Sequence, residues 1–141
     1  MNTPLISGKE IERLLPQRPP ILMIDQLIEA TEHEARTALT IVQNNIFCVD
    51  NNFREPGIIE HIAQSASALA GYNALCQSQP APVGYIGEVK KFHINRLPKA
   101  GDTLQTHLQI VSEVNGVSLL KAETMVETEL IASGQLKIFI E

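Results

Sequence analysis

The sequence predicts an α+β fold in which a curved antiparallel sheet wraps around one long helix. Residues 58–75 are almost all apolar or small, which predicts a thin helix that is buried over most of its circumference. The C-terminal half then alternates polar and apolar residues between turn signals, which indicates antiparallel strands. Such a helix needs the apolar face of a sheet to cover it. The four strands predicted in this half are residues 83–94, 103–114, 117–126 and 130–140.

Three turn signals connect these predicted strands. Asn115-Gly116 is the strongest hairpin signal in the chain, residues 127–129 predict a second reversal, and residues 98–102 a third. We therefore expect a meander in which each strand pairs with the next. A sheet of this kind leaves an edge strand, which pairing across a two-fold axis would cover, so a homodimer is the default expectation.

The N-terminal half carries a second set of local signals. Ser7 followed by Glu10 is a capping-box pattern and predicts a short helix that Pro16 ends. The strands predicted after it are residues 21–24 continuing to 27–28, and residues 34–42, while residues 46–49 form either a strand or a packed loop.

Length and charge limit the possible functions. A chain of 141 residues fits one compact domain, spanning residues 1–141, and its net charge of −5 argues against a nucleic-acid surface. The N-terminus lacks the plan of a signal peptide and no apolar run is long enough to span a membrane, so we expect no membrane partner and a cytoplasmic location. Cys48 and Cys76 share no motif, which favours free thiols over a disulfide. We expect no metal and no cofactor.

One acid stands out in the predicted central helix. Glu60 lies near the first turn of a segment that is otherwise apolar. A carboxylate in such a place is either desolvated or paired, and both conditions change its proton affinity. We therefore expect the chemistry of this protein at Glu60.

Three segments resemble the hot-dog-fold 3-hydroxyacyl-[acyl carrier protein] dehydratases. Residues 14–25 resemble their opening, which typically reads leucine-leucine-proline-histidine-arginine, an aromatic, proline and an apolar run ending in aspartate. Residues 56–64 are similar to their central-helix signature of proline-glycine, apolar residues, an acid, two residues and alanine-glutamine. Residues 84–92, with Pro98 and Gly101-Asp102 after them, resemble the strand and turn that line their acyl tunnel. The resemblance covers nearly the whole chain and implies the hot-dog fold.

The resemblance also implies a reaction, the elimination of water from a 3-hydroxyacyl thioester in fatty-acid or polyene-type lipid biosynthesis. It needs a base for the α-proton, an acid for the leaving hydroxyl and stabilisation of the enolate-like oxygen. In the family a histidine and a helix acid from opposite subunits supply the first two, and the acid corresponds to Glu60. Free N–H groups at Gly57, Ile58 and Ile59, where the helix is expected to begin, would stabilise the oxyanion. The substrate-binding residues implied are Phe53, Gly57, Ile58 and Gly87, the last because a missing side chain lets a substrate approach the backbone.

The family histidine has no counterpart here, because Asn52 stands in its place. An amide accepts no proton at neutral pH, so Asn52 could only orient a carbonyl or a water. Asp50 could act as a base beside Glu60, or it could simply form a turn. His61 could act with Glu60 if the substrate met it from another direction, or it could be a packed or interface histidine. Glu60 itself could be an ordinary first-turn acid.

These residues leave three functional hypotheses. The first is a dehydratase that acts on thioesters of acyl carrier protein or coenzyme A. The second, which Asn52 motivates, is a catalytically impaired acyl-binding subunit that partners an active paralogue in a heterodimer. The third is an acyl thioesterase, in which one helix carboxylate positions water. A basic cluster is either a docking patch for acidic acyl carrier protein or a solvated rim, and it comprises Lys90, Lys91, Arg96 and Lys99.

Overall fold

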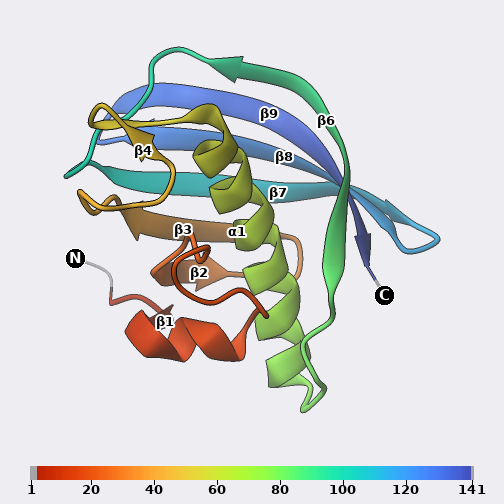
Figure 1. Ribbon diagram of the computed structural model, residues 1–141. Coiled ribbons are helices and arrows are strands. Elements are labelled where there is room, and N and C mark those ends of the chain that lie inside the picture. Colours follow the sequence, from red (N-terminus) through yellow and green to blue (C-terminus); the bar gives the residue numbers. More distant parts are fainter. Residues whose placement is uncertain (1–2, 141) are drawn as a thin grey trace.

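The computed structural model describes residues 3–140, and in it a seven-stranded antiparallel sheet curves around one helix of 22 residues (Figure 1). This confirms the predicted fold class. The elements are β1 (Ile6–Ser7), the 3-10 helix η1 (Gly8–Arg13), β2 (Gln26–Ala30), β3 (Glu34–Thr40), β4 (Cys48–Val49), β5 (Asn52–Phe53), α1 (Glu55–Cys76), β6 (Gly84–Ile94), β7 (Thr103–Val114), β8 (Val117–Val126) and β9 (Glu129–Ile140). None of the helices within residues 3–140 is long and apolar enough to cross a membrane.

The order of strands in the sheet differs from the predicted meander. β7, β8 and β9 pair in sequence through tight turns, and Asn115 and Gly116 both have positive φ (52° and 77°), as a two-residue hairpin turn requires. β6, however, pairs with β9 and forms the edge of the sheet, so the expected pairing of β6 with β7 was wrong. The segment between them is bonded elsewhere, because Phe53 N–H donates to Pro98 O and Gly101 N–H donates to Ile41 O. β6 therefore lies apart from β7, at the edge of the curved sheet beside β9 (Figure 1).

Two predictions for the N-terminal half need correction. Residues 21–24 form a loop rather than a strand, because a side chain, that of Gln64, bonds Met23 N–H and Ile21 C=O. The short helix exists as η1, but Ser7 makes no side-chain cap. Of the ambiguous residues 46–49, the last two form β4, which pairs with β5.

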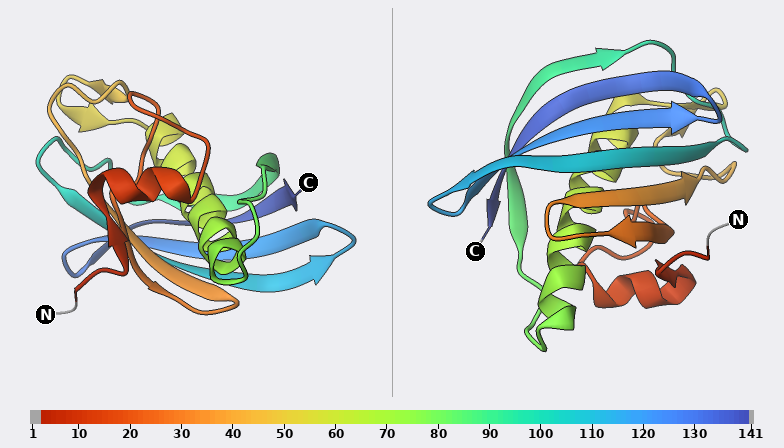
Figure 2. Two further views of the ribbon diagram at one scale, coloured as in Figure 1. Left: turned by 90° about the horizontal axis from the view of Figure 1, so that it is seen from below. Right: turned by 180° about the vertical axis from the view of Figure 1, so that it is seen from behind.

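The core lies between α1 and the concave face of the sheet, and the N-terminal segment packs beside the second half of α1 (Figure 2). Gly71 makes this approach possible, since a Cβ there would lie 1.9 Å from Leu14 O. Helix α1 begins at Glu55, three residues earlier than predicted, with Pro56 in its first turn.

Candidate active site

The carboxylate of Glu60 is held by a glutamine one turn further along α1. Gln64 Nε2 donates a 2.8 Å hydrogen bond to Glu60 Oε1 and a 2.9 Å bond to Ile21 O. Gln64 Oε1 accepts from Met23 N–H at 2.5 Å. The amide is therefore fully engaged and only 1% exposed, and its orientation is determined by the two acceptors and the one donor around it. Helix and N-terminal loop together fix one oxygen of Glu60.

Glu60 lines a pocket of about 210 Å³ between α1, the N-terminal loop and the edge strand β6. Gln17 enters it from the loop after η1, and residues 84–86 enter it from β6. The other lining residues are Ala63, Ser67 and Ile138. Among the lining residues, all within the described part of the chain, Glu60 is the one carboxylate and there is no histidine.

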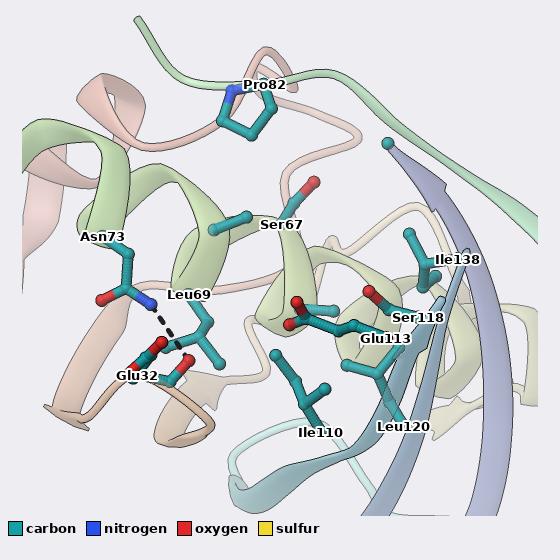
Figure 3. Close-up of a pocket in the computed structure, with 13 residues that line it drawn as sticks. Glu32, Ser67, Leu69, Asn73, Pro82, Ile110, Glu113, Ser118, Leu120 and Ile138 are labelled. Carbon is teal, nitrogen blue, oxygen red and sulfur yellow. Dashed lines mark hydrogen bonds between the residues drawn. The ribbon is translucent and has the colours of Figure 1, made fainter. Parts of the chain in front are cut away.

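A second cavity of about 230 Å³ continues from this pocket along α1 (Figure 3). The two cavities share Ser67, Gly84 and Ile138. The second is walled by Leu69 and Ala70 of the helix and by apolar residues of the sheet, and it reaches Asn73. Its polar lining residues also include Glu32, Glu113 and Ser118. At 1.5 Å per residue, the distance along the helix from Glu60 to Asn73 is about 20 Å. The apolar part of this lining is suited to an acyl chain whose reacting carbons lie at Glu60, and two further carboxylates, Glu32 and Glu113, border the second cavity.

His61 is fully buried and faces away from the Glu60 pocket, which it does not line. Its Nδ1 lies 2.8 Å from Met23 O, so Nδ1 carries the proton, and Nε2 accepts from Thr106 Oγ1 at 2.8 Å. Burial lowers the pKa of His61 to about 4. Both ring nitrogens of the neutral His61 are bonded within the protein, as expected for a packed histidine. This arrangement gives no support to a catalytic role for His61.

Asp50 and Asn52 lie in and beside the β4–β5 hairpin, and neither lines the Glu60 pocket. Asn52 Nδ2 donates to Asp50 O at 3.3 Å, and Asp50 is exposed with a φ of 52°, which fits a turn residue. One protomer therefore does not bring these residues to Glu60, and their proposed roles require that they act across a subunit interface.

The expected oxyanion donors are not free. Gly57 N–H donates to Arg54 O at 2.9 Å and Ile58 N–H to the same carbonyl at 3.3 Å, so that prediction was wrong for these two groups. The reason is the earlier start of α1. A Cβ at Gly57 would lie 2.6 Å from the Phe53 ring and 2.7 Å from Phe47, so this glycine makes room for an edge-to-face aromatic pair. Phe53 and Ile58 have no exposed surface, and their substrate contacts stay predictions.

Gly87 has a neighbour within the protein. A Cβ there would lie 1.8 Å from the ring of Phe139 on β9, at a bulge between the pairs Ile86↔Ile138 and Glu88↔Lys137. The ring of Phe139 takes the space that the sequence suggested for a substrate. Packing therefore explains this glycine, and a substrate contact at Gly87 stays a prediction.

Gln17, Gln64 and Ser67 lie at or beside the Glu60 pocket although the sequence predicted no role for them. Gln64 could have been found, because it lies four residues after Glu60 and so on the same side of a helix. No local spacing relates Gln17 to Glu60, since only the fold of the N-terminal loop onto α1 brings them together.

The fold and the groove define the class of this protein, which is a hot-dog protein of the dehydratase type. The chain belongs to the ApeP-like dehydratase family, whose sequence model, described as ApeP dehydratase, matches residues 9–141. This confirms the dehydratase-like function that the resemblance implied, whereas the loss of the family histidine at Asn52 stays a prediction.

Similar proteins agree with this assignment. The chain is 28% identical over 134 residues to a 3-hydroxyacyl-[acyl-carrier-protein] dehydratase FabZ of Shewanella frigidimarina, an alignment covering 91% of this chain and 88% of the relative. It is 29% identical over 142 residues to FabZ of Shewanella amazonensis, covering 96% and 92%. A solved structure, the dehydratase heterocomplex ApeI:P from Xenorhabdus doucetiae, has a TM-score of 0.80 at 13% identity and covers 100% of this chain and 93% of that one, which shows a shared fold.

Proposed function

We propose that this chain is one subunit of a dehydratase that removes water from 3-hydroxyacyl thioesters bound to acyl carrier protein, with Glu60 as the acid. The bond from Gln64 Nε2 to Glu60 Oε1 is the observation that carries the proposal. It occupies one oxygen of the carboxyl group and leaves the other, Oε2, to deliver a proton into the pocket. The names of the FabZ relatives support the substrate class.

The proposed reaction breaks two bonds of the substrate. The C2–H proton passes to a base, the C3–O bond breaks as Glu60 protonates the hydroxyl, and water leaves as the C2–C3 double bond forms. The acyl chain beyond C3 lies in the second cavity along α1. Because the lining of the Glu60 pocket offers no histidine, a second subunit supplies the base.

The edge strand β6 is the surface through which we propose that this subunit binds. β6 pairs on one side only, and Tyr85, Ile86 and Val89 leave large apolar side chains exposed along it. The same strand lines the Glu60 pocket, so a partner strand paired with β6 would bring its own residues to Glu60. A related chain that carries the family histidine is the proposed partner, which agrees with the heterocomplex named for the similar structure.

The basic cluster is the proposed contact surface for acyl carrier protein. Arg96 is already bonded to Glu129 at 2.9 Å and lies 3.6 Å from Asp102, and Lys90 lies 3.6 Å from Glu88. Lys91 and Lys99 are therefore the residues of the basic cluster that we propose to contact acyl carrier protein. Their electrostatic attraction to the acidic carrier would raise the association rate more than the affinity.

Reconstitution tests this proposal. A 3-hydroxyacyl-[acyl carrier protein] is incubated with this chain, with a histidine-bearing hot-dog subunit, and with the two purified as a complex, and the products are followed by mass spectrometry. The proposal predicts that the complex forms the 2-enoyl product faster than either chain alone. Full activity of this chain alone would contradict the need for a partner, and release of free carrier thiol would instead support the thioesterase hypothesis.

A further inference from the structure

A chain of buried hydrogen bonds runs beneath α1 and begins at the residue next to Glu60. His61 Nδ1 donates to Met23 O at 2.8 Å, and His61 Nε2 accepts from Thr106 Oγ1 at 2.8 Å. The hydroxyl of Thr106 has given its one hydrogen to His61, so Thr124 Oγ1, 2.7 Å away, donates to Thr106. No more than 1% of the surface of His61, Thr106 or Thr124 is exposed. The ring of His61 therefore connects strands β7 and β8 to the N-terminal loop.

Met23 is the point at which this chain of bonds meets Gln64. Its C=O accepts from His61 and its N–H donates to Gln64 Oε1, so side chains of α1 bond both polar groups of this loop residue. Because an N–H group can only donate, it requires the oxygen of the Gln64 amide on its own side and leaves the NH₂ group for Glu60. The position of Met23 thus determines which end of the amide faces the carboxylate.

We infer that His61 is a positioning residue, which acts through Met23 and Gln64 to hold one oxygen of Glu60 and keep the other free for the substrate. This inference rests on the proposed function. Without a donor at residue 61 the buried carbonyl of Met23 is unpaired, and the loop must shift to satisfy it. The shift loosens the bond that orients the Gln64 amide, and Glu60 loses its fixed direction. Because a displacement of about 1 Å at a reacting group can slow a reaction by about 10²-fold, the loss should appear in kcat.

A second branch of buried bonds supplies the matched control. Ser65, one turn after His61, donates to His61 O at 2.7 Å, and Thr37 Oγ1 on β3 donates to Ser65 Oγ at 2.7 Å. Ser65→Ala therefore leaves the buried hydroxyl of Thr37 unpaired and should lower stability. It keeps every bond on the path from His61 through Met23 to Glu60.

The kinetic test compares three variants of this chain in the assembled protein, His61→Leu, His61→Asn and Ser65→Ala, by 2-enoyl thioester formation well below their melting temperatures. His61→Leu fills the space of the ring but offers no donor, and should lower kcat at least about tenfold with KM within about twofold of the parent. His61→Asn returns an N–H donor to Met23 O and should recover most of kcat, although the smaller side chain lowers the melting temperature. Ser65→Ala should keep kcat while its melting temperature falls. A structural role alone would not lower kcat in His61→Leu and spare it in two variants that also lose stability.

Nitrogen-15 NMR tests the same arrangement without any turnover. The parent should show a neutral His61 ring with its proton on Nδ1, and slowly exchanging Gln64 NH₂ protons that His61→Leu loses and His61→Asn keeps. A proton on Nε2 instead, or an unchanged kcat in His61→Leu, would overturn the positioning role. An assembled parent that forms no 2-enoyl product would overturn the proposed function, whereas the NMR signals would still decide whether His61 orients Gln64.

Discussion

Gln64 donates a hydrogen bond from Nε2 to Oε1 of Glu60, 2.8 Å away and one turn earlier on α1. The same amide bonds the backbone of Ile21 and Met23, so the acid and the N-terminal loop share one support. The proposed acid and the fold of the loop therefore depend on one residue, and several predictions concern this residue or the groove that Glu60 borders.

Replacing Gln64 by alanine should weaken both stability and activity. The change leaves the buried N–H of Met23 and the carbonyl of Ile21 without a partner, which should lower the free energy of unfolding by roughly 2–4 kcal/mol. Urea unfolding measures this. Gln109→Ala is the matched control, because that amide bonds Glu34 on the exposed outer face of the sheet, and its effect should stay within about 0.5 kcal/mol. Equal effects of the two variants would contradict the supporting role of Gln64.

His61 should make stability depend on pH in the acidic range. Because burial lowers the pKa of His61 from 6.5 to about 4, the unfolded chain holds a proton between these values that the native protein does not. The free energy of unfolding should therefore fall by about 1.4 kcal/mol per unit as the pH drops through this range, or about 3 kcal/mol in total. Below about pH 4 both states are protonated at this ring and the slope from His61 ends.

The comparison with His61→Gln isolates this effect in urea titrations from pH 7 to pH 4. Asp25, whose pKa burial raises, titrates in both proteins and cancels in the difference. The histidine protein should show the steeper loss of stability toward low pH. Parallel curves would mean that the ring of His61 is not held neutral in the native state.

Filling the groove should shorten the acyl chains that the enzyme accepts. Ala70 lines the second cavity, and Ala70→Phe would place a ring across it. Dehydration of a long-chain substrate should fall at least about tenfold relative to a four-carbon substrate, because the ring competes with the distal chain alone. Ala74→Phe, on the same helix but outside the cavity lining, should keep the ratio of kcat/KM values. A uniform loss on all chain lengths would argue that the cavity is not the acyl site.

A charge on the edge strand should prevent assembly. Val89 is 38% exposed on β6, and Val89→Lys places an ammonium group on the surface proposed to meet the partner. Val111→Lys adds the same charge on β7, inside the sheet order, where the valine is 58% exposed. Analytical ultracentrifugation should show dissociation for the first variant only. Identical behaviour of the two would place the interface elsewhere.

The parts of this fold that the sequence predicted are those whose signals are local. Asn115-Gly116 forms a two-residue turn because asparagine and glycine both tolerate the positive φ that this turn requires, and the small apolar residues of α1 predict burial wherever the helix lies. The loop at residues 21–24 was missed because its hydrogen-bond partner, Gln64, comes from another element. The place of β6 was missed for a similar reason, since residues 95–102 bond to distant carbonyls rather than to a hairpin.

The candidate site divides in the same way. Glu60 could be singled out as a candidate because it is the one acid in an apolar segment. Gln64 could have been found from helical periodicity, because it lies four residues after Glu60. Gln17 and the Phe139 ring that fills the space at Gly87 depend on long-range packing, which one sequence does not express. The prediction of free N–H groups at Gly57 and Ile58 was wrong because it placed the start of the helix too late. The helix starts at Glu55, so both groups donate hydrogen bonds to Arg54 O.

The most direct test of the central claim is dehydration by Glu60→Gln, measured as 2-enoyl thioester formed per minute by the assembled enzyme. Glutamine keeps an acceptor for Gln64 and removes the transferable proton, so kcat should fall by about 10²–10⁴ while thermal stability is kept. Glu55→Gln, an exposed acid in the first turn of the same helix, should leave the rate unchanged. Full activity of Glu60→Gln would contradict the assignment of Glu60 as the acid of this dehydratase.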